Sequence, residues 1–151
     1  MFVWTTKVSR TKLAAIVAAI VAVVVLAAVI IAAKQGLPEE PAAGGTNEAR
    51  VAFLARYGWE VNAEPVRTQI VTIPTEDSEV FSRYNELQKS QGFDLTQYAG
   101  RRATQYVYEI LNYPDADQPV YATIFVLDGK IVGGDVTNTA PDGKMHGFKM
   151  P

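Results

Sequence analysis

An unbroken apolar run near the N-terminus places the strongest constraint on how this chain folds. Residues Leu13 to Ala33 read LAAIVAAIVAVVVLAAVIIAA and contain no charge, proline or glycine. As a helix, a run of this length spans about 31 Å, which matches a hydrocarbon core of about 30 Å. The run therefore predicts a transmembrane helix over residues 13–33.

The charges that flank this run predict its orientation in the membrane. Lys7, Arg10 and Lys12 precede the run, whereas Lys34 alone follows it closely. Because lysine and arginine are retained on the cytoplasmic side, we expect residues 1–12 to form a cytoplasmic basic N-terminus. The C-terminal part is then extracytoplasmic, in a single-pass protein of the cell membrane. The alternative is a cleaved signal peptide, although signal-peptide apolar cores are usually only about 7–15 residues long.

The alanines of the predicted membrane helix suggest a partner besides the lipid bilayer. Ala14, Ala18 and Ala22 recur every four residues. Small residues at this spacing let two membrane helices approach closely, which is the basis for self-association. The alternative is that a segment so rich in alanine shows this spacing by chance.

The residues after the apolar run predict a flexible linker and one domain. Residues 34–46 contain GLPEEPAAGGT, a proline- and glycine-rich stretch that is typical of a solvated spacer. Residues 47–151 have the length of one extracytoplasmic domain. Beyond residue 34 the chain carries ten Lys and Arg against sixteen Asp and Glu. This acidic balance argues against a nucleic-acid partner.

Local patterns predict that this domain is α+β. We expect helices over residues 47–57 and 76–91, and strands over residues 66–73, 101–112, 120–127 and 130–137. Asp128-Gly129 lies between the last two strands and is typical of a type I′ hairpin turn. The order α-β-α-β-β-β therefore predicts an antiparallel sheet of about four strands, with two helices packed on one face.

Two residues are candidates for catalysis. His146 is the only histidine, and histidine is the side chain that most readily exchanges a proton near neutral pH. Asp135 is the acidic residue that would orient it as a general base, as an envelope hydrolase requires. No serine or cysteine nucleophile motif accompanies them, so the alternative is a hydrogen-bonded histidine in a tail that packs on the sheet.

Three glycines are candidates for ligand binding. Gly133 and Gly134 lie inside the last predicted strand, where adjacent glycines mark a bulge or the close approach of a ligand. Gly147 follows the single histidine. The alternative for the strand glycines is a bulge that bends the strand over the helices.

The sequence predicts no metal site and no cofactor. The chain has one histidine and no cysteine, which excludes thiolate and multi-histidine sites as well as disulfides. Asp115 and Asp117 have the Asp-x-Asp spacing of a calcium loop. They lack the glycine and the distal glutamate of that loop, so a solvated turn is the simpler interpretation.

Six short motifs carry a resemblance to a known family. They are GWEV (58–61), YNELQ (84–88), QGFDL (91–95), YEILNYP (108–114), GGDV (133–136) and MHGF (145–148). In them the chain resembles an uncharacterised, membrane-anchored family of Gram-positive bacteria, family 4830 of the domains of unknown function. The resemblance implies one N-terminal membrane segment and a short exported domain, and it implies no activity. It places Gly134, Asp135, His146 and Gly147 at motif positions.

These features favour a non-catalytic binding or interaction module at the bacterial cell envelope. The partner we expect is an envelope protein, a peptide or a glycan, because a sheet edge is able to accept a further strand. The alternative function is an envelope hydrolase that uses His146 with Asp135.

Overall fold

The computed structural model describes residue 23, residues 41–76 and residues 78–151. The predicted transmembrane helix, except for Val23, and the cytoplasmic N-terminus lie outside these described residues. Within them, no helix combines the length and the apolar character needed to cross a bilayer. Residues Pro41–Pro151 form one compact unit.

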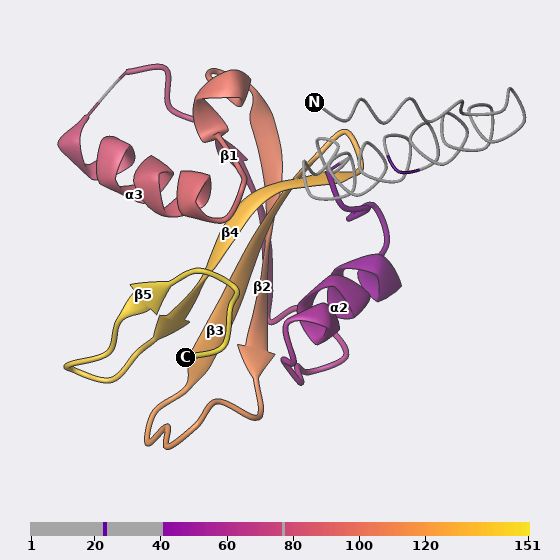
Figure 1. Ribbon diagram of the computed structural model, residues 1–151, viewed down its shortest axis with the longest axis vertical. Coiled ribbons are helices and arrows are strands. Elements are labelled where there is room, and N and C mark those ends of the chain that lie inside the picture. The colour runs from indigo at the N-terminus through magenta and orange to yellow at the C-terminus, as the bar shows by residue number, and fades with distance from the viewer. Residues whose placement is uncertain (1–22, 24–40, 77) are drawn as a thin grey trace, which may run out of the picture. The chain divides into compact units, whose positions relative to one another are not determined.

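The described part of this unit contains one antiparallel sheet and two α-helices. The elements follow in the order α2 (Asn47–Arg56), β1 (Arg67–Thr72), α3 (Glu79–Ser90), the 3₁₀ helix η1 (Leu95–Tyr98), β2 (Arg102–Ile110), β3 (Val120–Leu127), β4 (Lys130–Asn138) and β5 (Met145–His146). The strands lie in the order β1-β2-β3-β4-β5 (Figure 1). The α+β class is confirmed. The sheet has a fifth strand because Met145–His146 pairs with β4.

The two helices cover opposite faces of the sheet, so the prediction that both pack on one face is wrong. Leu54 of α2 lies in a core cluster with Ile124 of β3. Tyr84 of α3 packs edge-on against Phe125, the next residue of β3, with ring centroids 6.4 Å apart. Successive strand side chains point to opposite faces, which places α2 and α3 on different sides (Figure 1). Because β3 is apolar on both faces, each face needs a helix to cover it.

Local sequence signals explain where several elements begin and turn. The Thr46 side chain accepts a hydrogen bond from the backbone of Ala49 and caps α2. Ser78 caps α3 in the same way by accepting from Phe81. The predicted turn between β3 and β4 is confirmed, because Asp128 and Gly129 have φ values of 51° and 73°.

Candidate functional site

The outer edge of β4 is occupied along its whole length by other parts of the chain. At its start, the N–H of Ile131 donates to the carbonyl of Ala42 at 2.8 Å, and Gly44 donates to Gly129 at 2.9 Å. At its end, β5 pairs with Val136 and Thr137. We call this outer edge of β4 the covered edge.

A glutamine side chain occupies the middle of the covered edge. The N–H of Gly134 donates to Oε1 of Gln88 at 2.8 Å, and Nε2 of Gln88 donates back to the Gly134 carbonyl at 2.9 Å. Gln88 is fully buried. Its amide therefore satisfies β4 as the peptide group of a neighbouring strand would.

A second amide joins this edge to the C-terminal tail. Nε2 of Gln91 donates to the Gly134 carbonyl at 3.0 Å, while the N–H of Phe148 donates to Oε1 of Gln91 at 2.7 Å. Phe148 is fully buried in the core beside Phe53, with ring centroids 5.0 Å apart. The buried Phe148 ring and its backbone N–H therefore hold the C-terminal tail against the covered edge.

The outer edge of β1 has no such cover. The N–H of Ile73, just after β1, donates to the carbonyl of Arg101, just before β2, at 2.9 Å. In an antiparallel ladder every second residue directs its N–H and C=O groups toward the partner strand, so Val71 and Gln69 also face β2. The alternate residues Thr68, Ile70 and Thr72 direct their N–H and C=O groups outward. No described residue pairs with these backbone groups. We call this outer edge of β1 the open edge.

The composition of β1 does little to protect the open edge. Natural edge strands carry prolines, bulges or several charges that discourage further pairing. The sequence of β1, RTQIVT, has no proline and one charge, Arg67, and five of its six residues are exposed. Ile70, at its centre, is 60% exposed. The strand is therefore a template for one more strand.

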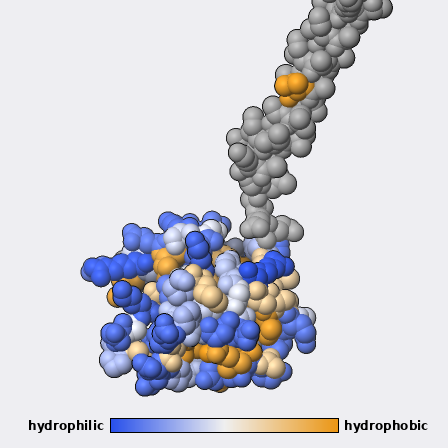
Figure 2. Space-filling model, turned by 60° about the horizontal axis from the view of Figure 1, so that its bottom comes forward, coloured by the Kyte–Doolittle hydropathy of each residue, from blue (hydrophilic) through white to orange (hydrophobic). Residues whose placement is uncertain are grey.

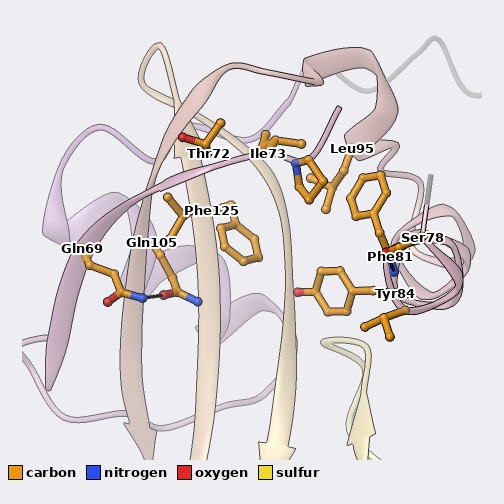
Figure 3. Close-up of a pocket in the computed structure, with 12 residues that line it drawn as sticks. Gln69, Thr72, Ile73, Ser78, Phe81, Tyr84, Leu95, Gln105 and Phe125 are labelled. Atoms are coloured by element: carbon orange, nitrogen blue, oxygen red, sulfur yellow. Dashed lines mark hydrogen bonds between the residues drawn. The ribbon is translucent and has the colours of Figure 1, made fainter. Parts of the chain in front are cut away.

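An apolar pocket lies beside β1 on the face that α3 covers. Its volume is about 390 Å³. Phe125 of β3 lies on the sheet side, and Phe81 and Tyr84 of α3 form the opposite wall (Figure 3). Val71 of β1 also lines the pocket. Val80, also on the α3 side, is 80% exposed. The open edge and this pocket form one continuous surface, because β1 residues belong to both.

The predicted candidate Asp135 is buried beneath α3. Its carboxylate accepts hydrogen bonds from the Tyr84 hydroxyl at 2.7 Å and from the Thr137 hydroxyl at 2.8 Å. Burial raises the pKa of Asp135 above its ordinary value, against the opposing effect of these two hydrogen bonds. Burial also raises the pKa of Tyr84, and the nearby Asp135 adds to that effect. The carboxyl group is thus fully engaged inside the domain.

His146 has different partners from those the hydrolase alternative requires. Its Nδ1 lies 2.6 Å from the carbonyl of Gly147, which only accepts, so Nδ1 carries a proton. Its Nε2 lies 3.2 Å from the Tyr113 hydroxyl. His146 pairs with Val136 in the sheet, and paired residues share a face, whereas Asp135 points to the other face. The structure therefore does not bring the two candidates into a hydrogen-bonded pair.

At the three candidate glycines, other parts of the chain lie where a side chain would be. A Cβ at Gly133 would lie 2.8 Å from Oε1 of Gln88, and one at Gly134 would lie 2.1 Å from the Thr123 carbonyl. A Cβ at Gly147 would lie 2.7 Å from the Gln91 side chain. A β-bulge does occur nearby, at the register shift opposite Phe125. These glycines admit the α3 amides, the neighbouring strand and the tail.

The fold and its open edge define a small α+β domain with a surface suited to strand addition. A family model described as Domain of unknown function (DUF4830) matches residues 53–136. The chain belongs to this family. The matched region includes β1, most of β4 and Asp135, and it ends before β5 and Gly147.

Comparison with curated proteins and with solved structures gave no match. In the described part of the chain, no three His, Cys, Asp or Glu side chains are grouped so that they could hold a metal ion.

Proposed function

We propose that this chain is a single-pass, membrane-anchored binding module that captures an extended segment of an envelope protein along the open edge. The observation that carries the proposal is the contrast between the outward backbone groups of β1, which have no described partner, and the fully paired edge of β4. A main-chain ladder supplies the affinity in this mode of recognition, and side-chain pockets supply the specificity.

The apolar pocket gives such a segment a place for one side chain. An added strand lies about 4.8 Å from β1, so its side chains on this face border Val71, which lines the pocket. Burial of one Leu or Phe side chain from water contributes about 1.5–3 kcal/mol. An apolar residue in the segment is therefore its anchor.

The charges near β1 favour an acidic segment. Arg67 lies at one end of β1, and Arg102 is paired with Thr72 at the other end. Neither arginine is in an ion pair with another described residue. A segment with an apolar centre and acidic flanking residues complements this edge.

Membrane anchoring rests on the apolar run Leu13 to Ala33 and on the basic residues that precede it. In this arrangement the partner lies at the bacterial cell envelope, within reach of the linker. The chain has no cysteine, so single introduced cysteines give an unambiguous topology assay. Asp115→Cys in full-length chain should react with a membrane-impermeant maleimide on intact cells, whereas Ser9→Cys should react only after lysis. Equal labelling of both variants before lysis would contradict the orientation.

Site-specific photo-crosslinking in cells tests strand addition. A photoreactive residue at position 70 should crosslink to one contiguous polypeptide segment, identified by mass spectrometry. The matched control is position 111, because Leu111 is 59% exposed and Ile70 is 60% exposed. Thr68→Pro removes an outward N–H and should abolish the crosslink at position 70. Equal crosslinking at both positions, no crosslink at position 70, or a crosslink that survives Thr68→Pro would contradict the proposal.

The pocket is tested separately by a charge placed at its mouth. Val80→Glu should weaken the crosslink at position 70 without lowering stability, because Val80 is 80% exposed. Leu111→Glu is the matched control and should leave the crosslink unchanged. If both variants behave alike, the pocket does not hold the anchor.

A further inference from the structure

A second hollow lies at the C-terminal tail, away from the residues that make up the open edge and the apolar pocket. Its volume is about 880 Å³. It is lined by Tyr57, Ser90, Gln91, Tyr113, residues 144–147 and residues 149–151. This volume falls in the range of pockets that hold small organic ligands. We call it the tail pocket.

Two of the side chains that line the tail pocket, Lys144 and Lys149, are cationic. Lys144, His146 and Lys149 line it, and no Asp or Glu does. Neither lysine is in an ion pair with another described residue. By contrast, residues 41–151 as a whole carry ten Lys and Arg against fourteen Asp and Glu. A local cationic hollow in an acidic domain attracts small anions in preference to extended anionic surfaces.

The walls of the tail pocket are held in place by stacked rings. Tyr113 stacks on the buried Trp59, with ring centroids 5.6 Å apart and planes 2° apart. Trp59 is fixed in turn, because its Nε1 donates to the Phe148 carbonyl at 2.6 Å. The Tyr113 hydroxyl meets Nε2 of His146. These contacts hold an aromatic wall next to the two lysines, which reduces the ordering cost of binding.

We propose that the tail pocket binds a soluble phosphate ester of a sugar or polyol. Lys144 and Lys149 contact the phosphate, since lysine ammonium groups bind phosphate as point charges. The Tyr113 ring and the remaining space hold the uncharged body of the ligand. A phospholipid headgroup carries the same chemistry, but the net charge of −4 on residues 41–151 opposes docking of the domain on an anionic bilayer.

The test uses full-length chain in nanodiscs of neutral phosphatidylcholine, with glycerol 1-phosphate as the soluble probe. Amide NMR signals of Gly147 and Lys149 should shift and saturate at millimolar probe. The double variant Lys144→Gln/Lys149→Gln should weaken binding by about tenfold or more, because each lost charged hydrogen bond costs over 1 kcal/mol. The control double variant Arg67→Gln/Arg102→Gln removes the same charge at the open edge and should leave the affinity within about twofold.

Three results would overturn this inference. The first is the absence of saturable shifts at Gly147 and Lys149. The second is an equal loss of affinity in both double variants, which would show that net charge alone attracts the probe. The third is a shift at these amides in nanodiscs that contain phosphatidylglycerol, without a response to glycerol 1-phosphate. That result would assign the pocket to a lipid headgroup.

Discussion

The two edges of the sheet differ in how they satisfy their backbone groups. The covered edge at β4 uses a bridging segment at Ala43, the buried amide of Gln88 and the short strand β5. The open edge at β1 leaves three outward residues without described partners. Unpaired strand edges promote aggregation, and this chain covers one edge by three separate contacts. The exposure of the other edge therefore calls for a functional explanation. This contrast is the basis of the proposal that the open edge binds a partner.

The exposed surface of the described domain carries both hydrophilic and hydrophobic side chains. On the face drawn in Figure 2, hydrophilic side chains predominate and hydrophobic ones are gathered in separate patches.

The sharpest test of this comparison places the same substitution on both edges. Val136→Pro removes an N–H that faces β5 and should lower the free energy of unfolding by about 3 kcal/mol or more. Ile70→Pro removes an outward N–H of β1, and proline is tolerated on edge strands whose N–H faces solvent, so the loss should stay within about 1 kcal/mol. Urea denaturation of both variants measures the two values. Similar losses in both would show that β1 is also paired.

Replacement of one glutamine on each edge tests the role of Gln88. Gln88→Leu leaves the N–H of Gly134 unsatisfied in the core and should lower stability by about 2–3 kcal/mol. Gln69→Leu, on β1, removes an exposed hydrogen bond to Gln105 and should change stability by less than about 0.5 kcal/mol. Denaturant midpoints give both values. A mild effect at Gln88 would mean that its amide is not needed to cover the edge.

The buried carboxyl of Asp135 on β4 gives the stability of the domain a pH dependence. Because burial raises the pKa of Asp135, the folded state holds its proton more tightly than the unfolded state does. Its stabilising contribution is fully present below the ordinary pKa of 3.8 and is lost as pH rises through the raised pKa. Wild type should therefore lose stability relative to Asp135→Asn between pH 4 and neutral pH. A constant difference between the two proteins across this range would contradict the burial argument.

A weaker, opposite pH effect is expected at the 3₁₀ helix that follows α3. Hydrogen bonds from Thr96 and Asn85 lower the pKa of Asp94 to about 2. The contribution of the Asp94 carboxylate to the free energy of unfolding is present above the ordinary pKa of 3.8 and is lost as pH falls through about 2. Asp94→Asn should accordingly reduce the acid-induced loss of stability in thermal melts. Unchanged acid sensitivity in this variant would show that the carboxylate is not the group responsible.

Much of the secondary structure could be predicted because its signals are local. Each signal involves residues that are close together in the sequence, as in the Asp128-Gly129 turn, the Thr46 cap and the β-branched run of β1. The placement of the helices could not be predicted from these signals. An apolar strand such as β3 demands cover on both faces, but its pattern does not state which helix covers which face.

The covered edge was missed because its contacts join distant segments. Gln88 and Gly134 are 46 residues apart, and Gln91 and Phe148 are 57 residues apart. The one available signal was the polar series Asn85, Gln88 and Gln91, which recurs every three residues and so shares a face of α3. An interpretation based on apolar periodicity assigns such amides to solvent. The pairing of His146 with Val136 also joins distant segments, and it places the side chains of His146 and Asp135 on opposite faces of the sheet.

Amide hydrogen exchange of the full-length chain tests the central claim most directly. The account predicts rapid exchange for the outward amides of Thr68, Ile70 and Thr72, and slow exchange for Gln69 and Val71, which face β2. On the covered edge, the Gly134 amide, bound to Gln88, should exchange slowly. If Thr68, Ile70 and Thr72 were protected as strongly as Gln69 and Val71, the edge of β1 would already be paired within the chain, and the proposed binding surface would not exist.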